Sequence, residues 1–183
     1  MPVRAIIFDA SGTILNDIHA VWKANSDAYG AFGLAGFGTL EEFKARFQLP
    51  VPEFHRANGV PRDLIGEVDC KFREFYPRYA SDVEVFPEVK DVLDELSKRG
   101  MMLGVVSNIP TLFLREHLKK FKIERYFCII NGQEDCDEQK PSPKPILITL
   151  ERIRIKPQEA MYIGDMEEDI IAAKRAKVRT AAL

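Results

Sequence analysis

A short apolar run near the start of the chain, Val3 to Phe8, ends abruptly at a carboxylate, Asp9. A run this short and continuous is typical of a strand that is buried on both faces, as in a parallel sheet. Ligands of open α/β sheets bind just beyond the carboxyl ends of the strands, which is where the sequence places Asp9. Gly12, in the turn that follows, allows the backbone to approach a ligand closely, so that nearby N–H groups can point at an anion. Taken alone, an Asp-x-x-Gly turn is equally typical of a strand end without a ligand.

Three later segments place further polar chemistry along the chain. Val105 to Asn108 ends a second apolar run in the hydroxyl of Ser107. Lys140 lies in a proline-rich loop, and Tyr162 to Asp169 ends another apolar run in a cluster of carboxylates. This ordered set of an aspartate, a hydroxyl, a lysine and an acidic pair resembles the motifs of the haloacid dehalogenase superfamily. The resemblance extends over nearly the whole chain.

The apolar periodicity divides the chain into a helical insert and an α/β core. Between Asn16 and Asp82 the pattern is helical and contains no strand candidate, and it predicts helices at about 18–29, 40–47, 51–58 and 61–76. From Phe86 onward helices alternate with strands, which we expect at 101–106, 127–130, 161–163 and 179–183. Repeated βα units predict a Rossmann-like α/β fold, a parallel sheet with helices on both faces. We expect a core of residues 1–15 and 83–183 and an all-helical cap of residues 16–82, inserted after the first strand.

The helical insert resembles the cap of the phosphoglycolate-phosphatase-like branch of the superfamily. This resemblance implies a separate lid on two short linkers, which closes to exclude water and complete the site. Four cap cations are candidates for contacts with an anionic substrate, although each is also typical of a solvated helix face: Lys23, Lys44, Arg46 and Arg56.

The resemblance also implies phosphoryl transfer on Asp9, which would be the nucleophile and form an aspartyl-phosphate. A phosphate and several carboxylates repel each other, so the site requires a divalent cation, and Mg²⁺ prefers hard oxygen ligands. The positions that match the metal ligands of the family are Asp9, Asp165 and the backbone carbonyl of Ser11. Asp169, one helical turn after Asp165, is a further candidate. Both later acids are also suited to cap a helix N-terminus.

The expected phosphate-binding groups are Gly12, Thr13, Ser107, Asn108 and Lys140. Ser107 would donate a hydrogen bond from its hydroxyl, and Asn108 would donate one from its backbone N–H. Lys140 would neutralise charge on the nucleophile and the phosphoryl group. Ser107 is also suited to cap the helix that follows it.

Ser11 departs from the phosphatase pattern, which has an aspartate two residues after the nucleophile for general acid–base catalysis. A serine hydroxyl is a poor proton shuttle near neutral pH, and losing such a group typically costs ~10²–10⁴-fold in rate. Haloacid dehalogenases carry an aromatic residue at this position, but they work without metal and lack the paired acids. Phosphonoacetaldehyde hydrolases carry an alanine there and keep the metal, but they need a cap lysine for a Schiff base, for which Lys44 is the candidate.

The favoured interpretation is a cytoplasmic, Mg²⁺-dependent, phosphatase-like hydrolase of a small phosphorylated metabolite, acting as a monomer or homodimer. The alternatives are hydrolysis of a C–P or carbon–halogen bond, or a catalytically impaired relative that binds a phosphorylated ligand or a protein partner.

The composition of the 183 residues agrees with this choice. A net charge of −2 provides no basic stripe for nucleic acid. No apolar stretch approaches the ~20 residues that span a membrane, and the first strand begins too early for a signal peptide. The three cysteines show no C-x-x-C spacing and are expected to be reduced. The three histidines lack metal-ligand spacing and are expected at the surface or in the cap: His19, His55 and His117.

Overall fold

The computed structural model describes residues 2–183, which form two compact units. The first unit contains the chain up to Asn16 and again from Val85 to Leu183. The second unit is the intervening segment, Asp17 to Glu84, and its regular structure is helical except for the first residue of a short strand at its end. Two short strands that the sequence did not predict, β2 (Leu15–Asn16) and β3 (Glu84–Val85), pair where the chain passes from one unit to the other.

The first unit is built on a sheet of five parallel strands in the order β5-β4-β1-β6-β7. Their bounds are β1 Ala5–Phe8, β4 Met102–Val106, β5 Ile129–Asn131, β6 Ala160–Gly164 and β7 Arg179–Ala182. The central strand β1 is buried along its whole length, as its continuous apolar run predicts. Since β1 lies between β4 and β6 and all three run the same way, their carboxyl ends meet at one edge of the sheet.

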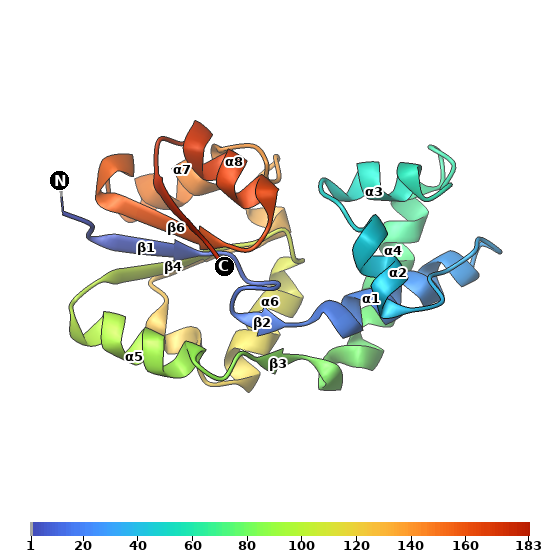
Figure 1. The fold of residues 1–183 in the computed structure, drawn as a ribbon, viewed down its shortest axis with the longest axis horizontal. Coiled ribbons are helices and arrows are strands. Elements are labelled where there is room, and N and C mark those ends of the chain that lie inside the picture. Colours follow the sequence, from blue (N-terminus) through green and yellow to red (C-terminus); the bar gives the residue numbers. More distant parts are fainter. Residues whose placement is uncertain (1) are drawn as a thin grey trace. The chain divides into compact units, whose positions relative to one another are not determined.

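Helices cover both faces of this sheet, with α7 and α8 on one face and α5 and α6 on the other (Figure 1). Their bounds are α5 Val89–Lys98, α6 Thr111–Lys120, α7 Lys144–Arg152 and α8 Glu167–Arg175, and short 3₁₀ turns lie at Glu124–Tyr126, Gln133–Asp135 and Pro157–Glu159. On the α7/α8 face, the core contains Ile7 and Tyr162 of the sheet packed with Ile146, Leu150 and Ala172 of the helices. This arrangement confirms the predicted α/β class.

The helical unit has an apolar core of its own. It consists of α1 (Ile18–Gly30), α2 (Leu40–Arg46), α3 (Val51–Ala57), α4 (Ile65–Phe75) and a 3₁₀ segment at Tyr76–Asp82. The rings of Tyr29, Phe37, Phe43 and Phe54 are buried together, and the Phe37 and Phe54 rings stack with 5.6 Å between their centroids. Thr39 caps the start of α2, where its hydroxyl accepts a hydrogen bond from the Glu42 N–H at 3.1 Å.

Several local expectations were wrong. Helix α4 begins at Ile65, four residues later than expected, and β5 begins at Ile129, two residues later. His117, expected at the surface or in the cap, lies on α6 of the first unit and is buried, with an exposed fraction of 3%. His55 lies in the helical unit, as expected, and is also buried there. None of the helices formed by residues 2–183 is long and apolar enough to cross a lipid bilayer.

Candidate active site

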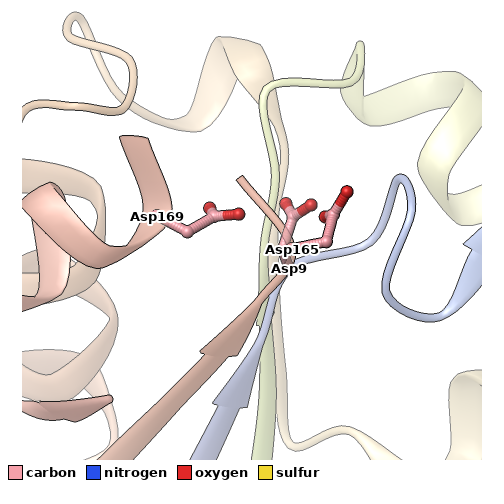
Figure 2. Close-up of side chains that lie close together, drawn as sticks. All are labelled: Asp9, Asp165 and Asp169. Carbon is pink, nitrogen blue, oxygen red and sulfur yellow. The ribbon is translucent and has the colours of Figure 1, made fainter. Parts of the chain in front are cut away.

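Three carboxylates meet at the carboxyl edge of the sheet. Asp9 directly follows β1, Asp165 directly follows β6, and Asp169 lies in the first turn of α8. Each contributes an oxygen to a cluster whose atoms all lie within 4.8 Å of one another. Figure 2 shows Asp9 and Asp165 side by side at the strand ends, with the Asp169 carboxylate directed toward them. Asp9 and Asp169 are buried, whereas Asp165 is exposed.

Lys140 is buried between two of these carboxylates, with 2% of its side chain exposed. Its Nζ donates to Asp9 Oδ1 at 2.5 Å and to Asp169 Oδ1 at 2.6 Å. The side chain of Asn108 fixes the backbone of this lysine: its Nδ2 donates to the Lys140 carbonyl at 3.3 Å, and its Oδ1 accepts from the Lys140 N–H at 3.2 Å. The lysine therefore reaches the site from a loop that is bonded to the end of β4.

The burial of these groups decides their electrostatics. Burial raises the pKa of Asp9 to about 7, although the Lys140 ammonium works in the opposite direction. Although Asp165 is exposed as a residue, partial desolvation of its carboxyl raises its pKa, and the hydrogen bond from Thr13 opposes this shift. Burial alone would lower the pKa of Lys140, but the surrounding negative groups, with Asp9 first, outweigh it and raise that pKa well above its ordinary value. Lys140 is therefore a permanent cation. Additional positive charge at this site would stabilise the ionised form of the carboxylates.

Two glycines make room for the carboxylates. A Cβ on Gly12 would lie 2.2 Å from Asp165 Oδ2, and a Cβ on Gly164 would lie 2.4 Å from Asp169 Oδ2. Gly12 also has a φ of +77°, a conformation that favours glycine. Its N–H donates to the Leu15 carbonyl at 2.8 Å, so this donor serves the turn. The role of Gly12 in anion binding stays a prediction.

The remaining predicted residues lie at the same edge. The Thr13 hydroxyl donates to Asp165 Oδ1 at 3.1 Å, which ties the turn after β1 to the end of β6. Ser107 is buried at the end of β4, and its Oγ accepts from the Ile109 N–H at 3.2 Å. Pro110, not Ser107, precedes the first residue of α6, so the capping alternative for Ser107 does not apply. Ser11 lies in the turn and forms an isolated bridge with Leu15.

Asp169 has two structural tasks. Its Oδ1 accepts from Lys140, and its Oδ2 accepts from the Met166 N–H at 3.2 Å, which caps the start of α8. One oxygen of Asp169 thus caps the helix, as the alternative expected, and the other faces Lys140 in the acidic cluster. The role of Asp169 as a metal ligand stays a prediction.

Sequence reasoning gave no role to Tyr162, whose hydroxyl lies 3.0 Å from Lys140 Nζ and 3.2 Å from Asp169 Oδ1. The side chain is fully buried. Burial raises the pKa of this hydroxyl well above its ordinary value, so that the group stays protonated. The sequence does carry one signal for this role. A tyrosine inside a buried strand indicates a buried polar partner, because a buried phenol needs a hydrogen-bond partner.

The donor set fits a divalent cation. One ammonium faces three carboxylates, which leaves an excess of two negative charges when all are ionised. The available atoms are hard oxygens, the type that Mg²⁺ prefers over nitrogen or sulfur ligands. The groups that would hold the ion are Asp9 and Asp165, with the backbone carbonyl of Ser11 as the further expected ligand.

The sequence matches a known family over nearly its whole length. The model of the haloacid dehalogenase-like hydrolases covers residues 6–183. The chain belongs to this family. The resemblance inferred from four short motifs is therefore confirmed, and so is the expectation of a hydrolase.

Two curated relatives are close in sequence. Phosphoglycolate phosphatase 1 of Pseudomonas aeruginosa is 30% identical over 98% of this chain and 69% of the relative. The phosphoglycolate phosphatase of Shigella boydii is 39% identical over 95% of this chain and 78% of the relative. The chain thus groups with the phosphoglycolate-phosphatase-like members of the family.

Solved structures share the fold at lower identity. A haloacid dehalogenase-like hydrolase of Streptococcus pneumoniae superposes with a TM-score of 0.86 at 22% identity, over 98% of this chain and 84% of that one. CbbY of Rhodobacter sphaeroides, solved with phosphate, gives a TM-score of 0.83 at 20% identity, over 97% of this chain and 84% of that one.

Proposed function

We propose that this protein is a Mg²⁺-dependent phosphatase of a small phosphorylated metabolite, with Asp9 as the nucleophile. The observation that carries this proposal is the position of Lys140, a buried cation bonded at 2.5 Å to the carboxylate that ends β1, with Asp165 and Asp169 beside it. This arrangement supplies a nucleophilic carboxylate, a fixed positive charge and an acidic pair in one place. The names of the curated relatives make phosphoglycolate the first substrate to test.

In the first step, an oxygen of Asp9 attacks phosphorus, the bond from phosphorus to the substrate oxygen breaks, and the leaving oxygen takes up a proton from water. Lys140 keeps Asp9 in place and offsets charge on the phosphoryl oxygens as it develops. Ser107 donates to one of those oxygens through its hydroxyl, and Asn108 contributes its backbone N–H. When Mg²⁺ is bound, it offsets the negative charge that the phosphoryl group adds to the acidic cluster.

In the second step, water attacks phosphorus of the aspartyl-phosphate, phosphate leaves, and the Asp9 carboxylate is restored. This step needs a base to take a proton from water. Ser11 stands where phosphatases of this family carry an aspartate, so a strong base is missing from that position. We therefore propose that release of phosphate from Asp9 limits turnover and that substrates with good leaving groups are favoured.

The cap-lysine alternative finds no support in the helical unit. A Schiff-base lysine needs a depressed pKa, which burial in an apolar pocket provides. Lys44 is exposed on α2, and Lys140 is the only buried lysine among residues 2–183. Two other cap cations are engaged on their own helices, where Arg46 pairs with Glu42 and Arg56 pairs with Glu53.

We also propose that the helical unit serves as the cap that selects the substrate. The support is that residues 17–84 form a compact unit with its own aromatic core, inserted between β2 and β3. Substitutions on its surface should change KM for different phosphate esters without abolishing turnover of a small activated substrate.

The proposed activity is tested with an aryl phosphate and phosphoglycolate, with and without Mg²⁺. We expect Mg²⁺-dependent release of phosphate by the wild-type protein and none by Asp9→Asn, which keeps the shape of the side chain but is not a nucleophile. Asp137→Asn is the matched control, because this carboxylate is 72% exposed and forms its ion pair with Lys144, outside the acidic cluster. Turnover that survives Asp9→Asn would overturn the proposal.

A further inference from the structure

The hydroxyl of Tyr162 reaches the centre of the site but takes no part in the two chemical steps. Tyr162 lies in the middle of β6 with no surface exposed. Its oxygen is 3.0 Å from Lys140 Nζ, 3.1 Å from the Val106 carbonyl and 3.2 Å from Asp169 Oδ1. A single atom is thus bonded to the end of β4, the lysine loop and the first turn of α8.

Lys140 uses this oxygen as its third acceptor. An ammonium group carries three N–H donors. Those of Lys140 are directed at Asp9 Oδ1, Asp169 Oδ1 and the Tyr162 hydroxyl. Since the lysine is buried, an N–H group that lost its acceptor would have no solvent to bond, which is costly for a charged donor.

Tyr162 in turn has an acceptor for its own proton. The hydroxyl donates to the Val106 carbonyl or to Asp169 Oδ1, which compete for one proton. Val106 directly precedes Ser107, the residue expected to bond the phosphoryl group. The Val106 carbonyl, a backbone group fixed at the end of β4, therefore helps to keep the Tyr162 hydroxyl next to Lys140 Nζ, together with the Asp169 side chain.

We propose that Tyr162 is a positioning residue, which fixes the orientation of the Lys140 ammonium and, through it, the Asp9 carboxylate. With all three N–H groups engaged, rotation about the Cε–Nζ bond is stopped, and Asp9 keeps one orientation for attack on phosphorus. The proposal rests on the proposed function, since it assigns Tyr162 a role in the phosphorylation of Asp9.

The test compares Tyr162→Phe with the wild type on an aryl phosphate. Phenylalanine keeps the ring and removes only the hydroxyl. We expect kcat/KM to fall about 10-fold or more, the effect of one hydrogen bond to a charged group, because kcat/KM reports the phosphorylation of Asp9 and not the later release of phosphate that limits kcat. The rate of Asp9 phosphorylation, measured by acid quench in a single turnover, should fall by the same factor.

Tyr29→Phe is the matched control. Tyr29 is also fully buried, and its hydroxyl lies 3.0 Å from His55 Nδ1 within the helical unit. This variant should lose thermal stability while its kcat/KM stays at the wild-type value. An equal loss of kcat/KM in both variants would mean that any lost buried hydroxyl has this effect, and it would overturn the proposal.

A double variant separates positioning from folding. In a Lys140→Met background there is no ammonium to orient, so adding Tyr162→Phe should leave the residual turnover unchanged. The double variant also has no buried ammonium N–H without an acceptor. It can therefore be measured even if Tyr162→Phe alone does not fold. A further 10-fold loss in this background would show that Tyr162 acts independently of Lys140 and would overturn the proposal.

A measurement without substrate or metal completes the test. The side-chain ammonium of Lys140, assigned by its loss in Lys140→Met, is followed by ¹⁵N NMR in the Mg²⁺-free protein. Its protons should exchange with water faster in Tyr162→Phe than in the wild type, and unchanged exchange would contradict the proposal. If instead the wild type shows no Asp9-dependent turnover while the exchange difference is present, the proposed function fails and the contact of Tyr162 with Lys140 stands.

Discussion

The close approach of Gly12 to Asp165 allows one substitution, Gly12→Ala, to test whether the position of the Asp165 carboxylate matters for activity. Gly12→Ala adds one methyl group, whose carbon would lie 2.2 Å from Asp165 Oδ2, 2.6 Å from Cγ and 2.9 Å from Oδ1. Real Cβ atoms essentially never approach other atoms closer than 3.0 Å, so the nearest oxygen must move by at least about 0.8 Å. The positive φ of +77° adds a backbone cost of about 1–2 kcal/mol for any residue with a side chain.

Gly100→Ala separates the two effects. Gly100 has a φ of +72°, close to that of Gly12, but a Cβ there would meet nothing within 4 Å. Both variants should therefore lose about 1–2 kcal/mol of unfolding free energy in urea melts. Only Gly12→Ala displaces a carboxylate, and a misplacement of this size typically costs roughly 10²-fold in rate.

The assay measures kcat/KM with an aryl phosphate in saturating Mg²⁺, and Mg²⁺ binding to the free protein by calorimetry. We expect Gly12→Ala to lose both activity and Mg²⁺ affinity, and Gly100→Ala to keep both. If Gly12→Ala bound Mg²⁺ and turned over substrate like the wild type, Asp165 would not be a metal ligand. If Gly100→Ala lost as much activity as Gly12→Ala, the backbone strain and not the carboxylate would be responsible.

Three further outcomes are expected. Ser11→Asp should raise steady-state turnover by up to ~10²-fold by restoring a proton shuttle, while the wild type should accumulate acid-stable phosphate on Asp9; a slower variant without a trapped intermediate would contradict this. Excess EDTA should stop turnover and added Mg²⁺ should restore it; full activity in EDTA would point to a metal-free dehalogenase mechanism. Burial lowers the pKa of His117 to about 4, so the folded protein binds fewer protons than the unfolded chain, and stability should fall by up to about 3 kcal/mol as the pH drops from 6.5 to 4. Urea melts at pH 7 and pH 5 should show roughly 2 kcal/mol of this loss, and His117→Gln should reduce it.

The features predicted best from the sequence are those that local patterns determine. The strands β1, β4 and β6 follow from continuous apolar runs, and Asp9 and Asp165 follow because parallel strands end at one edge. The helices α1, α2 and α3 likewise lie where the apolar periodicity predicts them, at about 18–29, 40–47 and 51–58.

What the sequence did not reveal depends on tertiary contacts. Strands β2 and β3 are two residues long, too short for any alternating pattern to mark them. His55 and His117 read as polar residues, yet neighbouring elements bury both. The bonds from Asn108 to the backbone of Lys140, and from Tyr162 to its side chain, join segments that no spacing in the sequence relates.

The ion pairs of Lys140 also bear on the order in which the chain assembles. Its two carboxylate partners are 131 residues earlier and 29 residues later in the chain, so neither pair forms by local folding. A buried ammonium with only one partner keeps most of its desolvation cost, which makes any state that contains Asp9 and Lys140 but not α8 unfavourable. During synthesis on the ribosome, Lys140 therefore stays in water until Asp169 has emerged and α8 has docked. Lys140 thus favours the joint burial of Asp9, Asp169 and its own ammonium over any partly assembled state of this sheet edge.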